Sequence, residues 1–337
     1  MKKWKMICVC LTLLTIFLAL TGCGTNSQNG TNNGSEARTD ITIVLDWTPN
    51  TNHTGIYVAQ AKGYFADAGL NVTILQPPED GADMAVATGQ AQFGIGFQET
   101  LAMALTSDNP LPITAVAAVL EHNTSGLISM KDKGIDSFKD LEGKTYASWN
   151  TPAEAAIIDQ CMREEGSSYD KLNTVPNSGA DALSLMQASD VDVVWVYEGW
   201  DVVMADLAGL EYNFIRFADV SPVLDFYTPV VIANNDFLAE QPETAKAFLA
   251  ALAQGYEYAI ENPSKAAEIL CEAVPELDPE LVAASQEYMK DQYKAEKEVW
   301  GPIDETRWVD FYSWMYERGL TTIDLGKAGF TNEYLPE

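Results

Sequence analysis

The chain of 337 residues carries 49 acidic and 20 basic side chains, a formal net charge of −29 at pH 7. This balance excludes nucleic acid as a partner, because binding to phosphates needs a basic surface, and an anionic membrane surface would repel the same charge. Two histidines and five cysteines without a cysteine cluster give no set of metal ligands, so we expect neither a metal nor another cofactor. We interpret the acidity as a source of solubility, not as a guide to a ligand.

The N-terminal segment predicts secretion and lipid attachment. A basic start, Met1–Lys5, precedes an apolar stretch that ends in Leu20-Thr21-Gly22-Cys23. Small residues directly before a cysteine resemble the bacterial lipoprotein signal, so we expect residues 1–22 to be removed as a signal peptide and Cys23 to be diacylated. Residues 23–39 are rich in Gly, Asn, Ser and Thr and predict a flexible tether. The alternatives, an ordinary leader or a transmembrane anchor, fit less well because the apolar stretch is short for a span.

Two further cysteines, Cys161 and Cys271, lie in stretches that we expect to be helical. They could pair in an oxidising compartment, or they could remain as two buried thiols. The sequence contains no Gly-rich phosphate loop and no nucleophile elbow, so it offers no motif for nucleotide binding or acyl transfer.

Strands and helices alternate along the chain with short connections. Apolar, β-branched stretches predict strands over residues 41–45, 71–75, 93–96, 113–120, 145–147, 172–175, 191–196, 214–215 and 230–233. Helical spacing of apolar residues predicts helices over residues 56–62, 80–88, 99–105, 153–164, 181–188, 244–261, 264–273, 279–293 and 306–318. This order predicts an α/β fold with mostly parallel sheets and a helical C-terminal third. The strand at 230–233 is expected to return to the first half of the chain.

Three motifs carry a resemblance to a known family. The order of elements resembles the type II periplasmic-binding-protein fold, in which two α/β lobes are joined by a hinge and a ligand binds between them. Within that fold, Leu45–Gly55, Ala61–Phe65 and Phe330–Leu335 resemble the NMT1/THI5-like family. The resemblance covers nearly the whole chain after residue 39, and its opening motif is more specific for the family than for a ligand.

The resemblance implies a domain plan and a function. It places lobe 1 at residues 40–128 and 230–337, and lobe 2 at residues 129–229. It implies a monomeric extracytoplasmic binding protein of an ABC importer, lipid-anchored to the cell membrane, that delivers a thiamine-related aminopyrimidine to a permease. The formylaminopyrimidine and hydroxymethylpyrimidine types are the expected ligands, and a riboflavin-like heterocycle or a sulfonate is the alternative.

The same family contains a fungal pyrimidine synthase, which is the competing interpretation. Its pattern has a lysine and a histidine in the stretch that corresponds to Phe93–Thr100, and a cysteine-rich segment elsewhere. This sequence has none of these, so it lacks the lysine that would form a Schiff base with pyridoxal phosphate. We therefore expect a protein that binds without catalysis.

The loop after the first strand supplies the first candidate ligand contacts. Open α/β sheets bind ligands at the carboxyl ends of their strands. Trp47 offers a flat π face there, and Asn50 can donate to and accept from the edge of a heterocycle. His53 matches a position carried by relatives. Alternatively, Trp47 packs under its own loop, and the Asn and His side chains serve the turn.

The second cluster follows the strand at 191–196. Glu198 is the candidate partner for the exocyclic amine and the ring nitrogen of an aminopyrimidine, while Tyr197 and Trp200 could stack on the ring or close over it. The resemblance to pyrimidine-binding members supports such an acidic and aromatic cluster. The alternative is that the alternation along the strand buries some of these side chains and leaves Glu198 in solvent.

Further candidates lie at strand-to-helix corners. Thr151 has the pattern of an N-cap, with Pro152 at the first helical position, and we expect free amides beside it and Asn150 to face a ligand. Gln98 occupies a similar corner in the first lobe, and Tyr227 precedes the returning strand. Each of these could instead be purely structural.

Overall fold

The computed structural model describes residues 38–336 except 178, 180, 188 and 189. The predicted signal peptide, the lipid-attachment residue Cys23 and most of the predicted tether lie outside the described residues. Thr39, which was expected to end the tether, is the first residue of β1. None of the helices in the described part is long and apolar enough to cross a membrane.

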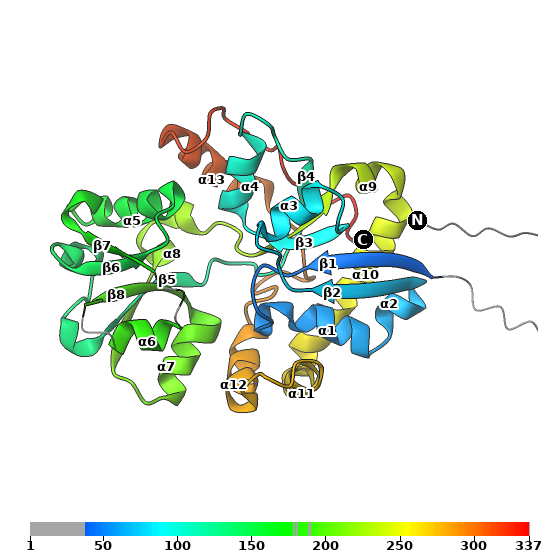
Figure 1. Cartoon of the computed structure of the whole chain (residues 1–337), viewed down its shortest axis with the longest axis horizontal. Coiled ribbons are helices and arrows are strands. Elements are labelled where there is room, and N and C mark those ends of the chain that lie inside the picture. Colours follow the sequence, from blue (N-terminus) through cyan, green and yellow to red (C-terminus); the bar gives the residue numbers. More distant parts are fainter. Residues whose placement is uncertain (1–37, 178, 180, 188–189, 337) are drawn as a thin grey trace, which may run out of the picture. The chain divides into compact units, whose positions relative to one another are not determined.

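Ten strands form two five-stranded sheets within the described residues (Figure 1). The first sheet has the order β2-β1-β3-β10-β4 and the second has the order β7-β6-β8-β5-β9. We call each sheet, with the helices packed on it, the first and the second lobe. The strands are β1 (Thr39–Val44), β2 (Leu70–Leu75), β3 (Phe93–Gly96), β4 (Ile113–Ala118), β5 (Ser125–Met130), β6 (Thr145–Ser148), β7 (Asn173–Pro176), β8 (Val193–Tyr197), β9 (Tyr212–Arg216) and β10 (Val230–Asn234).

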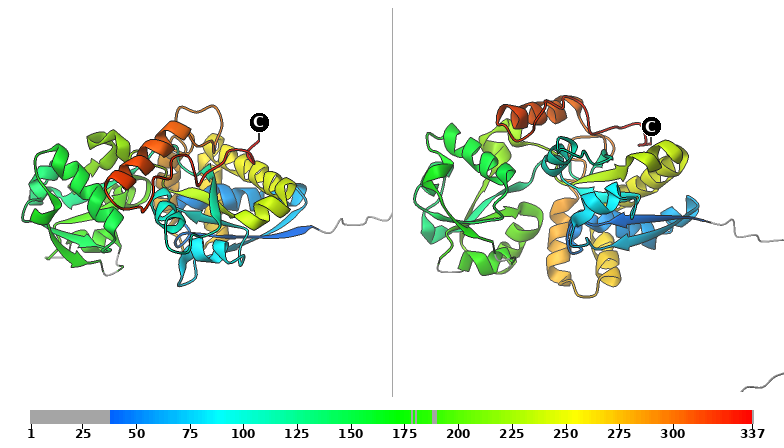
Figure 2. Two further views of the ribbon diagram at one scale, coloured as in Figure 1. Left: turned by 90° about the horizontal axis from the view of Figure 1, so that it is seen from above. Right: turned by 45° about the horizontal axis from the view of Figure 1, so that its top comes forward.

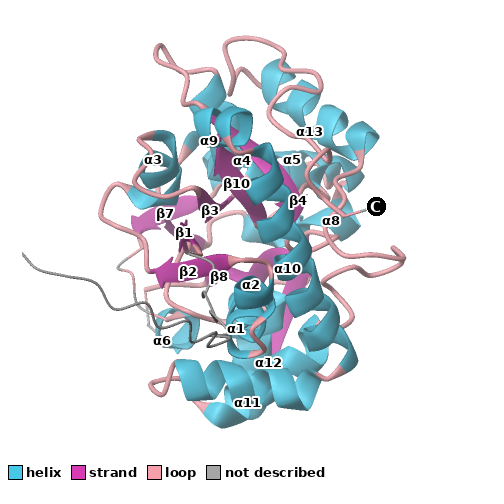
Figure 3. Ribbon diagram, turned by 90° about the vertical axis from the view of Figure 1, so that its right-hand side faces the viewer, coloured by secondary structure: helices cyan, strands magenta, loops and turns pink. Residues whose placement is uncertain are grey.

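Helices cover both faces of the first sheet. Ile41 and Ile43 of β1 pack with the core of α1 and α10, whereas Val44 packs on the opposite face with α3 and α4, as the alternation of a strand requires. Figure 3 shows α1, α10, α11 and α12 gathered on one side of this sheet, and α3 and α4 on the other. The helices are α1 (Thr54–Ala61), α2 (Tyr64–Asp67), α3 (Gly81–Ala87), α4 (Gln98–Leu105), α5 (Pro152–Glu164), α6 (Ala182–Gln187), α7 (Val203–Leu207), α8 (Phe217–Val220), α9 (Asn235–Glu240), α10 (Pro242–Glu261), α11 (Pro263–Ala273), α12 (Pro279–Met289) and α13 (Glu305–Glu317).

Each sheet is mixed, not mostly parallel as expected. β10 runs antiparallel to both β3 and β4, and β5 runs antiparallel to both β8 and β9. These two strands follow the places where the chain crosses between the sheets: from β4 to β5, over residues 119–124, and from β9 to β10, over residues 217–229. A strand that enters a sheet from the other lobe has no crossover helix of its own, so it is free to pair antiparallel. The expected return of residues 230–233 to the first sheet is confirmed.

The expected boundary between residues 128 and 129 falls inside β5, all of which belongs to the second sheet. The sequence pattern did not indicate this strand, because Ser125, Gly126 and Ser129 interrupt its apolar residues. Gly126 is required by packing: a Cβ there would lie 2.3 Å from the carbonyl oxygen of Ile215 on β9. A buried central strand with small polar residues shows neither the alternation nor the β-branched composition on which sequence prediction relies.

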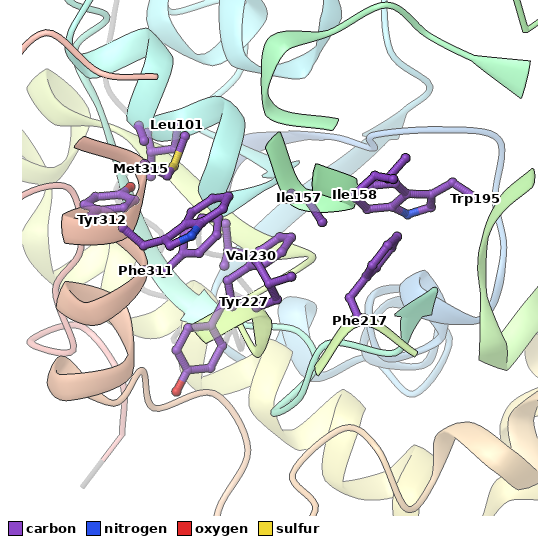
Figure 4. Close-up of a cluster of buried hydrophobic side chains, with 14 of the residues drawn as sticks. Leu101, Ile157, Ile158, Trp195, Phe217, Tyr227, Val230, Phe311, Tyr312 and Met315 are labelled. Atoms are coloured by element: carbon purple, nitrogen blue, oxygen red, sulfur yellow. The ribbon is translucent and has the colours of Figure 1, made fainter. Parts of the chain in front are cut away.

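The helix α13 packs against both lobes. Phe311 stacks on Phe226 of the second crossing at a ring distance of 4.2 Å, and Trp314 donates from Nε1 to Gln160 of α5 at 3.1 Å. Figure 4 shows Phe311, Tyr312 and Met315 beside Leu101 of the first lobe, within one buried cluster that extends to Trp195 and Phe217 of the second lobe. Both views of Figure 2 show α13 lying along the two lobes.

Candidate functional site

A cavity of about 750 Å³ lies between the two sheets. Its walls come from the segments that follow the carboxyl ends of β1 and β3 in the first lobe, and of β6 and β8 in the second. These four strands pair in parallel with their neighbours β2 and β7 or with each other. Parallel strands of an open sheet end at the same edge, which is where such folds bind ligands. The volume is in the range of sites for small molecules.

Aromatic side chains from both lobes line the cavity. They are Trp47, Phe97, Trp149, Trp195, Tyr197 and Trp200. Trp47 and Trp149 are 63% and 51% exposed, although a large aromatic side chain is usually well buried. They come from opposite lobes, and neither ring stacks on another aromatic ring or a cation among the described residues.

The charged lining of the cavity is acidic. Five carboxylates line it, from Asp46, Glu99, Glu154, Asp181 and Asp201. Among the residues that the structure describes, no Lys, Arg or His lines it. Such a wall favours a ligand that is neutral or cationic and that donates hydrogen bonds, and it disfavours an anion.

Two of these carboxyl groups keep their protons more strongly than usual. Burial raises the pKa of Glu99 to about 8, with a smaller contribution from the nearby charge of Asp83. Burial also raises the pKa of Asp201 to about 6, although its carboxylate accepts a hydrogen bond from the amide of Tyr197. At neutral pH Glu99 is therefore predominantly a neutral acid, which can donate as well as accept.

Five of the predicted contact residues line the cavity: Trp47, Asn50, Thr151, Tyr197 and Trp200. Thr151 is the N-cap of α5, as predicted, and its Oγ1 accepts from the amide of Glu154 at 3.2 Å. Asn50 caps the turn that follows it, and its side chain accepts from the amide of Asn52 at 2.9 Å.

His53 does not line the cavity. Its ring is fully buried, Nδ1 accepts from the amide of Asn50 at 3.1 Å, and Nε2 lies 2.6 Å from Oδ1 of Asp46. Because Nδ1 accepts a hydrogen bond, the proton of the ring is on Nε2, which donates a hydrogen bond to Asp46. The imidazole therefore holds the loop in which Trp47 lies.

Glu198 also lies outside the cavity wall. It begins a π-helical turn over Glu198–Val202, and its carboxylate pairs with the guanidinium of Arg216 on β9. Tyr197 points into the cavity from the end of β8, and the next side chain points away from it. Tyr197 and Trp200 of the predicted cluster therefore line the cavity, whereas Glu198 does not, and its pairing with Arg216 could not be foreseen because Arg216 is distant in sequence.

Gln98, Tyr227 and Asn150 are the remaining predicted residues that the cavity excludes. Gln98 is buried: its Oε1 accepts from the amide of Tyr227 at 2.8 Å and its Nε2 donates to the carbonyl of Trp308 at 3.2 Å. The hydroxyl of Tyr227 accepts from the amide of Asp304 at 2.8 Å. Asn150 has a left-handed backbone, with φ of 60°, and its amide donates to Ser148. These three residues fix the corners beside the cavity.

Glu99, Trp149 and Asp201 are among the lining residues that the sequence prediction did not name as contacts. Each is next to a residue that was named, at the same strand-to-helix corner. The positions of these corners could be predicted from the sequence. Which side chain of a corner faces the cavity depends on the orientation of the first helical turn relative to the sheet. That orientation is fixed by distant packing and leaves no local signal.

A group of side chains outside the cavity could offer ligand atoms to a metal. Atoms of Glu121, His122 and Glu296 lie within 4.8 Å of one another. Both imidazole nitrogens already have acidic partners, and the guanidinium of Arg307 contacts Glu121, so a further cation is disfavoured there. Cys161 and Cys271, both described, are free thiols.

Comparisons with known proteins give one family and several similar chains. The family model described as NMT1/THI5 like matches residues 50–266. The formylaminopyrimidine-binding protein of Halalkalibacterium halodurans is 27% identical over 321 residues, which cover 94% of each chain. The 4-amino-5-hydroxymethyl-2-methylpyrimidine phosphate synthase of Legionella pneumophila is 26% identical over 250 residues, 72% of this chain and 76% of the synthase. The solved structure of the alkanesulfonate-binding protein of Xanthomonas axonopodis pv. citri bound to MOPS has a TM-score of 0.68 at 12% identity, over 87% of this chain and 98% of that chain.

Proposed function

The chain belongs to the NMT1/THI5-like family and has the periplasmic-binding-protein fold, and on this premise we propose that it is an extracytoplasmic solute-binding protein for a thiamine-related aminopyrimidine. The observation that carries the proposal is the lining of the cavity. Aromatic faces from both lobes surround an acidic wall that has no basic side chain among the described residues. The similarity to a formylaminopyrimidine-binding protein over 94% of both chains supports the same ligand class.

An aminopyrimidine matches this lining group by group. Its flat ring can lie against the faces of Trp47 or Trp149. Its exocyclic amine donates hydrogen bonds, which the acidic wall accepts. The indole nitrogen of Trp195 is buried and has no hydrogen-bond partner within the described chain, so it is a donor available to a ring nitrogen or a formyl oxygen.

Capture would couple to closure of the lobes. We propose residues 125–216 as the core of the second lobe, with hinges at the crossings 119–124 and 217–229. A ligand held between Trp47 and Trp149 would contact both lobes only when they are closed, so it would stabilise the closed form by that difference in contact. The closed form would then dock on an ABC permease, and a lipid on Cys23 would keep the monomeric protein at the outer face of the membrane.

The lining favours binding without catalysis. Some relatives are synthases by name, but the stretch Phe93–Thr100 has no lysine or histidine, and no described lysine reaches the cavity wall. A Schiff base therefore has no amine to form on there. A sulfonate is equally disfavoured, because a permanent anion would face five carboxyl groups without a cation.

Thermal unfolding tests the ligand class. The purified protein is heated alone and with formylaminopyrimidine, 4-amino-5-hydroxymethyl-2-methylpyrimidine, thiamine, riboflavin or taurine. A ligand at a hundred times its Kd should add about 2.7 kcal/mol to the free energy of unfolding. A shift with an aminopyrimidine supports the proposal. A shift with riboflavin or taurine alone contradicts the ligand class and leaves a binding protein for another solute.

A further inference from the structure

Four of the five carboxyl groups in the cavity wall already have protein partners. The partners are His53 for Asp46, the amide of Tyr197 for Asp201, the amide and hydroxyl of Ser184 for Asp181, and Tyr146, Ser148 and the amide of Trp149 for Glu154. Glu154 in particular receives hydrogen bonds on both oxygens and is buried. Each of these four groups already accepts at least one hydrogen bond from the protein.

Glu99 differs from the other four. It is the second residue of α4, directly after β3, and its Oε2 is buried with no hydrogen-bond partner within the described residues. The same side chain lines the cavity. A buried carboxyl oxygen without a partner destabilises a protein, so its persistence in a cavity wall points to a partner that comes from outside the chain.

The groups that face Glu99 are acidic or neutral. They are Asp83 of α3, Tyr197 of β8 and Tyr312 of α13. Burial disfavours the ionised form of all three, and the charge of a neighbouring carboxyl adds to this for the two tyrosines. Thr100, next in the chain, interacts with Asp83. No cation among the described residues contributes to the environment of Glu99; a hydrogen bond from its own backbone amide favours the carboxylate, but burial outweighs it.

We infer that Glu99 recognises the ligand as a neutral carboxylic acid, by pairing with the edge of a heterocycle that carries an amino group next to a ring nitrogen. The hydroxyl of the acid donates to the ring nitrogen, and its carbonyl accepts from the amine. This inference rests on the proposed function and deepens it, because it selects neutral molecules with an adjacent donor and acceptor. An ionised carboxylate could accept from the amine but would meet the lone pair of the ring nitrogen with a second acceptor.

The sign of the pH dependence follows from this pairing. The protonated form binds, so affinity is full below the pKa of Glu99, about 8, and falls as pH rises through it. Above that value Kd should weaken by about tenfold for each pH unit. A carboxylate that pairs with a protonated pyrimidine would instead lose affinity at the lower pKa of the ligand itself.

Calorimetric titration of the purified full chain tests the inference. The probe is 4-amino-5-hydroxymethyl-2-methylpyrimidine, titrated between pH 7 and 9.5, and the protonation of the free probe is measured over the same window. Glu99→Gln keeps a donor and an acceptor without a titrating group, so its Kd should stay within about threefold of the wild type at pH 7 and should not change with pH. Glu99→Leu should weaken Kd at least about thirtyfold. Glu243→Gln, an exposed change on α10, is the matched control and should keep the wild-type pH profile.

Each outcome decides between the two proposals. A flat wild-type profile, or Glu99→Leu binding as well as the wild type, would overturn the role of Glu99 and leave the proposed function standing. Glu99→Gln binding as weakly as Glu99→Leu would overturn the neutral-acid pairing. If the wild-type chain binds neither this probe nor formylaminopyrimidine, both the proposed function and the inference fail. Thermal unfolding of each variant shows whether it is folded.

Discussion

Two acidic regions of this chain differ in how their charges are paired. At the crossings, Arg307 of α13 donates to Glu121 at 2.5 Å and to Asp225 at 3.0 Å, and its guanidinium lies 4.1 Å from the ring centre of Tyr227. His122 lies between Asp225 and Glu296. In the cavity, carboxyl groups meet without any described cation, and two tryptophan faces are open. Carboxyl groups and aromatic rings thus have cationic partners at the crossings and lack them in the cavity. The cavity is therefore the region in which we expect a ligand to supply the missing partner.

The largest expected effect would come from breaking the complete region. Arg307→Ala removes the guanidinium that joins Glu121 to Asp225, and both are largely buried; it leaves Glu121 only Lys297 at 3.6 Å and Asp225 only His122. We expect the free energy of unfolding to fall by about 3 kcal/mol. Arg307→Lys keeps the positive charge but cannot donate to both carboxylates as the guanidinium does, so the free energy of unfolding should fall by less than in the alanine variant. Chemical denaturation measures both, and an alanine variant as stable as the wild type would show that the cluster does not hold the crossings.

Substitution of the exposed Trp47 or Trp149 should have the opposite effect, with little change in stability and a large loss of affinity. Trp47→Ala or Trp149→Ala removes a side chain that is more than half exposed, so stability should change by about 0.5 kcal/mol or less. Affinity for an aminopyrimidine should fall by about tenfold to a hundredfold, because the ligand loses an aromatic face to cover. Titration calorimetry beside thermal unfolding separates the two effects. A large loss of stability with unchanged affinity would mean that these rings serve their own loops.

Glu99→Gln should sharpen the comparison by stabilising the unliganded protein at alkaline pH. The folded pKa of Glu99, about 8, is above the unfolded value, so the unfolded state loses its proton first and stability falls as pH rises from about 4.5 to 8. Glutamine has no proton to lose. We expect a gain of at least about 1 kcal/mol at pH 8 and a smaller gain at pH 5. An equal effect at both pH values would contradict a raised pKa.

His122 should give the smallest effect, and its pH window is different. Its hydrogen bond with Asp225 raises its folded pKa to about 9, above the unfolded value of about 6.5; Glu296 adds to this rise, and burial opposes it. The stabilisation is therefore complete below pH 6.5 and is lost as pH rises through 9. Since the imidazole is 39% exposed, we expect about 1 kcal/mol or less. His122→Gln should remove this part of the pH dependence in denaturation curves.

The sequence predicted local features of the site well. The N-cap at Thr151 was predicted from Thr151, Pro152 and Glu154, and the structure confirms it. This signal is local because capping involves only four consecutive residues. Trp47, Tyr197 and Trp200 were found because strand ends can be recognised from composition. Glu198 was misassigned, since its partner Arg216 is eighteen residues away, and β5 was missed because a buried strand with Ser and Gly lacks a pattern.

The attachment of α13 would limit the hinge motion that we propose for the lobes. A body joined to another by two adjacent strands can both bend and twist about them. Here a third connection, the face of α13 with Phe311 on the second crossing and Trp314 on α5, lies along the same side of the molecule. Two crossings and α13, along one side, would resist twisting of one lobe against the other and would leave a single bending motion. In the proposed motion, Trp47 and Trp149 would therefore approach and separate along one path.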